Sequence, residues 1–120
     1  MGTRGDQVCG IFGFVAPGGV RKSDLDRLAV HAERRGRDSS GILSLEGPTY
    51  HVDRADYPLS RLLSLVRPYT RPVVMGHSRL ITNGLADNQP VIRENVGLLH
   101  NGIIVNHEAI WDLLDIPRKL

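Results

Sequence analysis

Cysteine and aromatic side chains are scarce in this sequence of 120 residues. The one cysteine excludes a disulfide within the chain, and no stretch is typical of a secretory signal or a membrane span, so we expect a reducing, cytoplasmic setting. Aromatic residues make up 5% of the chain and the formal net charge is +2, which leaves little means to stack on bases or to neutralise phosphates. The composition therefore argues against nucleic acid and against a membrane as partners.

The rest of the composition is that of one globular domain. Hydrophobic residues make up 41% and charged residues 23% of the chain, which is ordinary for a protein that buries a core. Because both strand and helix patterns recur and the connections are typical of hairpins, we predict a mixed α+β fold rather than a doubly wound parallel sheet. The expected strands span residues 10–15, 42–45, 49–52 and 72–75, and the expected helices span residues 23–35, 58–67 and a segment after 106.

Local signals indicate where these elements begin and end. Ser23 and Asn106 are typical N-cap residues, and Pro58 suits the first turn of a helix. Residues 76–84 are expected to form a polar loop after the strand at 72–75. The dipeptide Asn-Gly at 101 and 102 lies between two apolar runs, a pattern that favours a tight hairpin turn at that point.

Cys9 directly precedes the apolar run at residues 10–15 and admits two interpretations. It is a small buried hydrophobe, or it is a nucleophile held at the end of a strand. A nucleophilic thiol needs a base, and an amine or one of the five histidines could serve. His77 and His100 lie at strand ends, so a Cys–His dyad with either of them stays open. The spacing of these residues matches no metal-binding pattern, and no metal site is predicted.

Three polar positions also carry two interpretations each. Asn101 and Gly102 form a plain turn, or they supply a side-chain amide and a backbone N–H that point at one oxyanion. Arg79 is an ordinary surface arginine, or its guanidinium binds a substrate carboxylate through two parallel hydrogen bonds.

Four runs in a fixed order resemble a known family. They are CGIFGFV at residues 9–15, RGRDSSG at 35–41, HSRLITNG at 77–84 and LHNGIIVNHE at 99–108. Together they resemble the glutaminase domain of the class II glutamine amidotransferases, which are N-terminal-nucleophile hydrolases. The resemblance extends from Cys9 to about Leu114. The last run is most similar to the branch of that family that makes amino-sugar phosphates, the isomerising glucosamine–fructose-6-phosphate aminotransferases.

The resemblance implies a fold, a reaction and a role for each matching residue. The family fold is a four-layer αββα sandwich, of which this chain would be the N-terminal portion. Cys9 would attack the side-chain amide of L-glutamine, form a thioester and release ammonia, with its own free α-amino group as the base and no cofactor. The other matching positions would have these roles: Asn101 and Gly102 form the oxyanion hole, Arg79 holds the α-carboxylate, Thr82 and Asn83 complete the substrate pocket, and Arg35 and Gly36 surround the nucleophile.

Two features depart from the family pattern. Cys9 is not the first residue, so we expect residues 1–8 to be a cleaved leader or a mis-assigned start, with Val8 where the family has its initiator methionine. Residues 9–120 are shorter than a family glutaminase domain, so we expect the first part of a truncated domain. No residue matches the acidic side chain that binds the amino group of glutamine.

The expected partners follow from the same resemblance. A synthase or sugar-isomerase domain outside this chain would use the ammonia, with fructose 6-phosphate as the acceptor, and a homodimer is compatible with this arrangement. Two alternatives stay open. One is the glutaminase module of a different synthase, and the other is a catalytically inactive fragment of the same fold that serves as an interaction or structural module.

Overall fold

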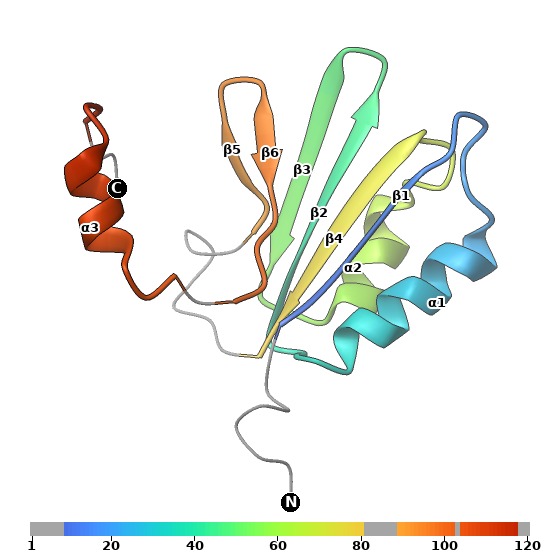
Figure 1. Cartoon of the computed structure of the whole chain (residues 1–120). Helices are drawn as coiled ribbons and strands as arrows, with labels where there is room; N and C mark the ends of the chain where they lie inside the picture. Colours follow the sequence, from blue (N-terminus) through green and yellow to red (C-terminus); the bar gives the residue numbers. More distant parts are fainter. Residues whose placement is uncertain (1–8, 81–88, 103, 118–120) are drawn as a thin grey trace, which may run out of the picture.

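The computed structural model describes residues 9–80, 89–102 and 104–117 of the chain (Figure 1). Within these ranges six strands and three helices follow one another. Their order and bounds are β1 (Gly10–Val15), α1 (Lys22–Glu33), β2 (Ser39–Glu46), β3 (Thr49–Ala55), α2 (Leu59–Val66), β4 (Val73–Arg79), β5 (Val91–Arg93), β6 (Val96–Leu98) and α3 (His107–Leu113). No helix in the described ranges is both long enough and apolar enough to cross a membrane.

Four strands form an antiparallel sheet in the order β1-β4-β2-β3. β1 lies at the edge, where Gly10 pairs with Ser78 of β4, and β4 in turn pairs with β2. The predicted α+β character agrees with this antiparallel sheet and its helices. The expected polar loop from residue 76 is wrong in its first part, because β4 continues to Arg79. Its small residue Gly76 suits this position since the ring of Phe12 packs where a side chain would otherwise lie.

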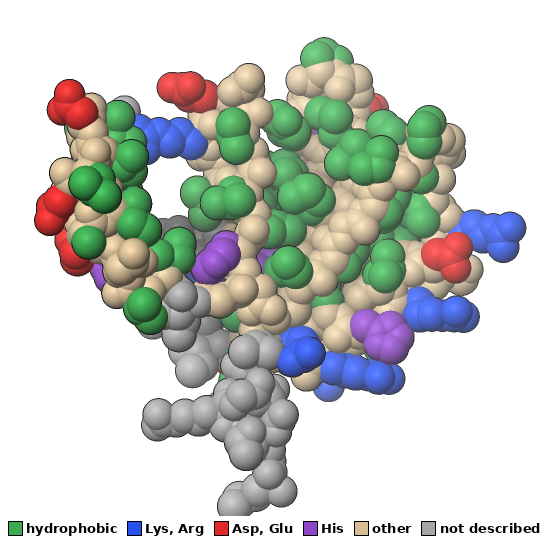
Figure 2. Space-filling model, in the orientation of Figure 1, with side chains coloured by type: hydrophobic (Ala, Val, Ile, Leu, Met, Phe, Trp, Pro, Cys, Tyr) green, Lys and Arg blue, Asp and Glu red, His purple; other side chains and the backbone are tan. Residues whose placement is uncertain are grey.

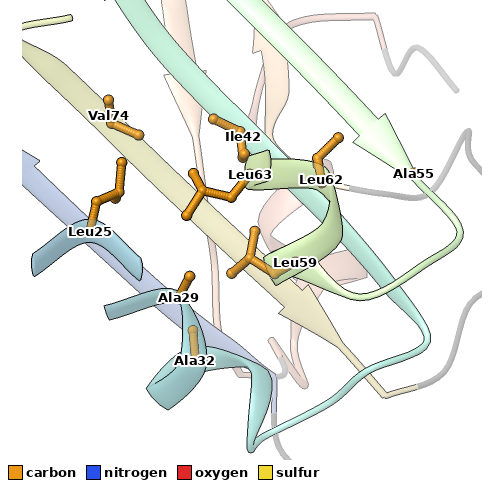
Figure 3. Close-up of a cluster of buried hydrophobic side chains, with 9 residues drawn as sticks. All are labelled: Leu25, Ala29, Ala32, Ile42, Ala55, Leu59, Leu62, Leu63 and Val74. Carbon is orange, nitrogen blue, oxygen red and sulfur yellow. The ribbon is translucent and has the colours of Figure 1, made fainter. Parts of the chain in front are cut away.

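Helices α1 and α2 cover one face of the sheet and form the core with it (Figures 1 and 3). In α1 the buried residues Leu25, Ala29 and Ala32 recur at helical spacing, so one stripe of the helix faces the strands. In α2 the fully buried Leu59 and Leu63 do the same. The cluster is completed by Ile42, Ala55, Leu62 and Val74, which lie around them in Figure 3.

The opposite face of the sheet carries apolar side chains that are only partly covered. Ile11 and Val15 of β1 are 47% and 77% exposed. The two-stranded β5–β6 sheet covers another part, since Gly97 lies against Leu43 of β2. Hydrophobic side chains gather over the strands in the space-filling view (Figure 2). Helix α3 has no buried residue and lies apart from the sheet in Figure 1.

Two local predictions are wrong. Ser23 does not cap α1, because the helix begins one residue earlier and Arg21 occupies the N-cap position. The expected hairpin turn at 101 and 102 is also wrong, because β5 and β6 close through Glu94 and Asn95 instead. Glu94 adopts a positive φ of 55°, and the Tyr50 hydroxyl donates a 3.3 Å hydrogen bond to the Asn95 carbonyl, so contacts with β3 support the earlier turn.

Candidate active site

Three of the residues predicted to act together, Cys9, Arg35 and Asn101, line one open pocket of about 240 Å³. The pocket lies along the free edge of β1, beside the end of α1. Its other lining residues are Gly10, Ile11, Phe12, Leu28, His31 and Ala32. Asn101, which lies more than sixty residues after Arg35 in the sequence, therefore meets Arg35 at the one cysteine of the chain.

Cys9 is held in place by β1, which begins at the next residue. The residue after it, Gly10, pairs with Ser78 and lies directly under the end of α1, since a Cβ on Gly10 would come within 2.1 Å of the Ala32 carbonyl oxygen. This close contact brings the last turn of α1 and the following Arg35 to the side of the thiol. Cys9 is half-buried, so its sulfur is sheltered and still reachable from the pocket.

The loop that carries Arg35 and Gly36 is fastened to the end of β4. The Asp38 N–H donates a 2.8 Å hydrogen bond to the Arg79 carbonyl, and the Ser78 hydroxyl donates to the Gly36 carbonyl. A Cβ on Gly36 would lie 2.3 Å from the backbone nitrogen of Leu80, so only glycine fits there without a backbone shift. Gly36 therefore supports the site by packing rather than by lining the pocket.

Arg79, another predicted substrate-binding residue, is not among the described residues that line this pocket. Arg79 ends β4 opposite Ser39 and shares the sheet face of His77, away from the helices, because alternate residues of a strand point to opposite faces. Its guanidinium contributes to lowering the pKa of His77. Thr82 and Asn83 lie outside the described residues.

Asn101 and Gly102 are exposed and follow β6 as an irregular segment. Gly102 has a φ of +144°, a conformation that side chains with a Cβ rarely adopt. The His100 ring packs beside it, with two ring atoms 3.5 Å from where a Gly102 Cβ would be. The side chain of Gln89 holds the backbone of His100 through two hydrogen bonds, and sequence patterns gave no reason to single out this glutamine.

The histidines differ in their relation to the thiol. His31 is exposed and lines the pocket with Cys9. His77 and His100, the two left open as partners in a Cys–His dyad, are absent from the pocket lining in the described part of the chain. His77 is 1% exposed, and its Nε2 has no hydrogen-bond partner among the residues that the structure describes. Within the described ranges, no group of three or more His, Cys, Asp or Glu side chains is placed to hold a metal ion.

The buried imidazole of His77 predicts a loss of stability in acid. Burial, followed by the positive charge of Arg79, lowers the pKa of His77 from 6.5 to about 4. The unfolded chain therefore binds more protons than the folded chain between these values. The contribution of His77 to the free energy of unfolding is thus fully present above pH 6.5 and is lost as the pH falls toward 4. The loss attributable to His77 is up to about 3 kcal/mol. Urea unfolding of the wild type and His77→Phe at several pH values measures the difference.

The exposed His31 supplies the control for this measurement. His31→Gln should retain the pH dependence of the wild type, whereas His77→Phe should show a shallower dependence between pH 6.5 and 4. Equal dependence in the wild type and His77→Phe would contradict the assignment to His77.

Most of the chain is similar in sequence to curated proteins. It is 36% identical over 111 residues to a protein named glutamine–fructose-6-phosphate aminotransferase (isomerising) from Bradyrhizobium diazoefficiens, a match that covers 86% of this chain. Proteins of the same name from Rhizobium meliloti and Chlamydia muridarum are 32% and 33% identical over 112 and 118 residues, which cover 89% and 93% of the chain. No protein-family model matches the sequence. The matches span 18–19% of the length of these three relatives, so the chain corresponds to about a fifth of proteins that are named for glutamine and fructose 6-phosphate.

Proposed function

We propose that the chain is a glutaminase module, which hydrolyses the side-chain amide of L-glutamine and releases ammonia through a thioester on Cys9. The observation that carries the proposal is the pocket in which Cys9, Arg35 and Asn101 meet from three distant segments. Homology to glutamine-using aminotransferases supports the choice of substrate.

In the proposed reaction the Cys9 thiolate attacks the side-chain carbonyl carbon of glutamine, and the C=O electron pair moves onto the oxygen. The thiol proton passes to the α-amino group of Cys9, once that group is free, and then to the leaving nitrogen. As the tetrahedral intermediate collapses, the C–N bond breaks and ammonia leaves. Water then attacks the thioester and gives glutamate and the thiol. An α-amine is a general base suited to neutral pH, so it can accept this proton without a histidine.

The oxyanion of that intermediate would be stabilised by the Asn101 side-chain amide and the Gly102 N–H. Each such donor contributes roughly 3 kcal/mol to transition-state stabilisation in other enzymes. Arg79 would bind the α-carboxylate of glutamine from the end of β4, and Arg35 would border the thiol. Thr82 and Asn83 are assigned to the same substrate pocket on the family resemblance alone.

The layers of the fold support the N-terminal-nucleophile sandwich as the proposed architecture. Helices α1 and α2 supply an α layer on one face of the sheet, and the other face exposes Ile11 and Val15 of β1. In an αββα sandwich a second sheet packs on such a face, because two sheets bury their apolar sides against each other. The four-stranded sheet and its helices are therefore proposed as half of the sandwich.

The acceptor of the ammonia is proposed from the relatives. Their name joins glutamine to fructose 6-phosphate, so we assign this sugar phosphate as the acceptor, on a synthase or isomerase domain outside this chain. A second candidate, an inactive module with an interaction role, is favoured by one observation. Val8 precedes Cys9, so in a chain that retains residues 1–8 the nitrogen of Cys9 is an amide and is not basic.

Covalent labelling tests the proposal and separates the two candidates. The chain is prepared with Cys9 as its first residue and, in parallel, with residues 1–8 retained, and intact mass verifies each N-terminus. A glutamine analogue with an electrophile in place of its amide should label Cys9 in the first protein, and free glutamine, but not asparagine, should protect it. No labelling of the protein with a free Cys9 amine would refute the glutaminase proposal, whereas labelling and turnover with the leader in place would refute the role of the amine.

A further inference from the structure

Gln89 binds the backbone of His100, the residue before the proposed oxyanion donor Asn101. Its side-chain Nε2 donates a 2.9 Å hydrogen bond to the His100 carbonyl, and the His100 N–H donates a 2.6 Å hydrogen bond to Oε1. The amide of Gln89 thus pairs with both polar backbone groups of one residue, as a neighbouring strand would. Two such bonds fix the orientation of the His100 backbone as well as its position.

Gln89 is itself anchored to the four-stranded sheet. Its main chain lies on β2, where a Cβ on Gly41 would come within 1.6 Å of the Gln89 carbonyl oxygen. The next residue, Pro90, is buried, and its carbonyl accepts two hydrogen bonds from the Arg54 guanidinium of β3, at 3.1 Å from Nε and 2.7 Å from Nη2. A continuous path of contacts therefore leads from β2 and β3 through Gln89 to His100.

This path matters because the segment it reaches has little packing of its own. His100 and Asn101 are both exposed, yet Asn101 contributes to the lining of the pocket beside Cys9. Oxyanion donors must be held within tenths of an ångström of their target to favour the transition state. An exposed segment meets that demand only if a rigid part of the fold holds it.

We infer that Gln89 is a positioning residue, which holds the Asn101 and Gly102 donors at the thiol by fixing the backbone of His100. The inference rests on the proposed glutaminase function and adds a residue to its machinery. It also assigns Arg54 a supporting role, because Arg54 fixes the main chain from which the Gln89 side chain extends.

Gln89→Met tests this role, because it keeps the length of the side chain and removes both hydrogen bonds. We expect kcat for glutamine hydrolysis to fall about tenfold to a hundredfold, as a misplaced oxyanion donor would cause, with KM changing less than about threefold. In the Asn101→Ala background the same substitution should have almost no further effect, because the donor that it positions is already absent. Amide hydrogen exchange of residues 99–102 should accelerate about tenfold or more in Gln89→Met, while exchange in α1 and β4 stays unchanged.

A pair of arginine substitutions completes the experiment. Arg54→Met removes the two hydrogen bonds to the Pro90 carbonyl and should lower kcat by a smaller factor than Gln89→Met does. It replaces Gln89→Met as the test if that variant does not fold. Arg93→Met, the same chemical change on exposed β5, is the matched control and should leave kcat and exchange unchanged. A wild type that neither hydrolyses glutamine nor reacts with the electrophilic analogue would refute the proposed function. An active wild type with unchanged kcat in Gln89→Met, or additive losses with Asn101→Ala, would refute the positioning role alone.

Discussion

Replacing Cys9 by alanine should abolish the release of ammonia from glutamine, lowering kcat by on the order of 10⁴-fold or more. No other described side chain that lines the pocket is a nucleophile of comparable strength, so the thioester has no alternative attachment point. The substitution keeps the Cβ and removes only the sulfur from a half-buried position, so the fold should persist. Enzyme-coupled detection of ammonia, on protein whose first residue is residue 9, measures the effect.

The control for Cys9 concerns the group that accepts its proton. Wild-type protein that retains residues 1–8 keeps the Cys9 thiol but lacks the basic α-amine. Its kcat should be about 10²- to 10⁴-fold lower than that of the protein that begins at Cys9. Substituting His31, the histidine that lines the pocket in the described chain, should then have only a small effect. Substantial activity with the leader retained, lost on His31→Gln, would instead assign the base to His31.

Asn101→Ala is expected to have the next largest effect, a fall in kcat of about 10²- to 10³-fold with little change in KM. The Asn101 amide is proposed to meet the substrate oxygen only when that oxygen becomes negative, so its loss weakens the transition state more than the bound substrate. Steady-state kinetics on glutamine give both parameters. Asn101→Asp should be impaired to a similar extent, because a carboxylate supplies no donor and repels the developing charge.

Asn95→Ala is the matched control for Asn101, because Asn95 is also exposed and lies in the turn between β5 and β6. The Tyr50 bond goes to its backbone carbonyl, which alanine retains, so kcat and KM should equal those of the wild type. A rise in KM at constant kcat for Asn101→Ala would mean that Asn101 binds ground-state glutamine and is not an oxyanion donor.

Sequence patterns predicted the elements whose stability depends on a repeated apolar stripe. Leu25, Ala29 and Ala32 lie one helical turn apart and are buried in α1 as their spacing requires. The strand that follows Cys9 is found as β1 with its predicted bounds. These signals are local, because each residue is read against neighbours within one or two turns of the same element.

The errors arise where distant parts of the chain decide the local structure. β4 extends to Arg79 because it pairs on both sides, with β1 and with β2, and a short polar sequence is held extended between them. The hairpin turn lies at Glu94 rather than at Asn101 because β3 supports it through Tyr50. Such pairings depend on tertiary contacts, which override the preference of a dipeptide.

The site shows the same division. The residue types at Cys9 and Asn101 indicated nucleophile chemistry, Arg35 was added by the family resemblance, and the structure brings these three to one pocket. Arg79 and Gly36 do not line it among the described residues: Arg79 ends β4, and Gly36 packs on that end. Nothing in the residues around Gln89 indicates its role, because a glutamine before a proline forms no periodic or turn pattern with the segment it holds.

The pairing of β1 with β4 sets the order in which the site can assemble during synthesis. β1 leaves the ribosome before β4, and the sheet partner of Gly10 is Ser78, nearly seventy residues later. At roughly 5–20 residues per second, several seconds pass before that partner exists. Throughout this interval the Cys9 thiol lacks its strand neighbour, and the Asn101 wall of its pocket emerges later still. The nascent chain therefore carries a thiol open to small oxidants well before the pocket around it can form.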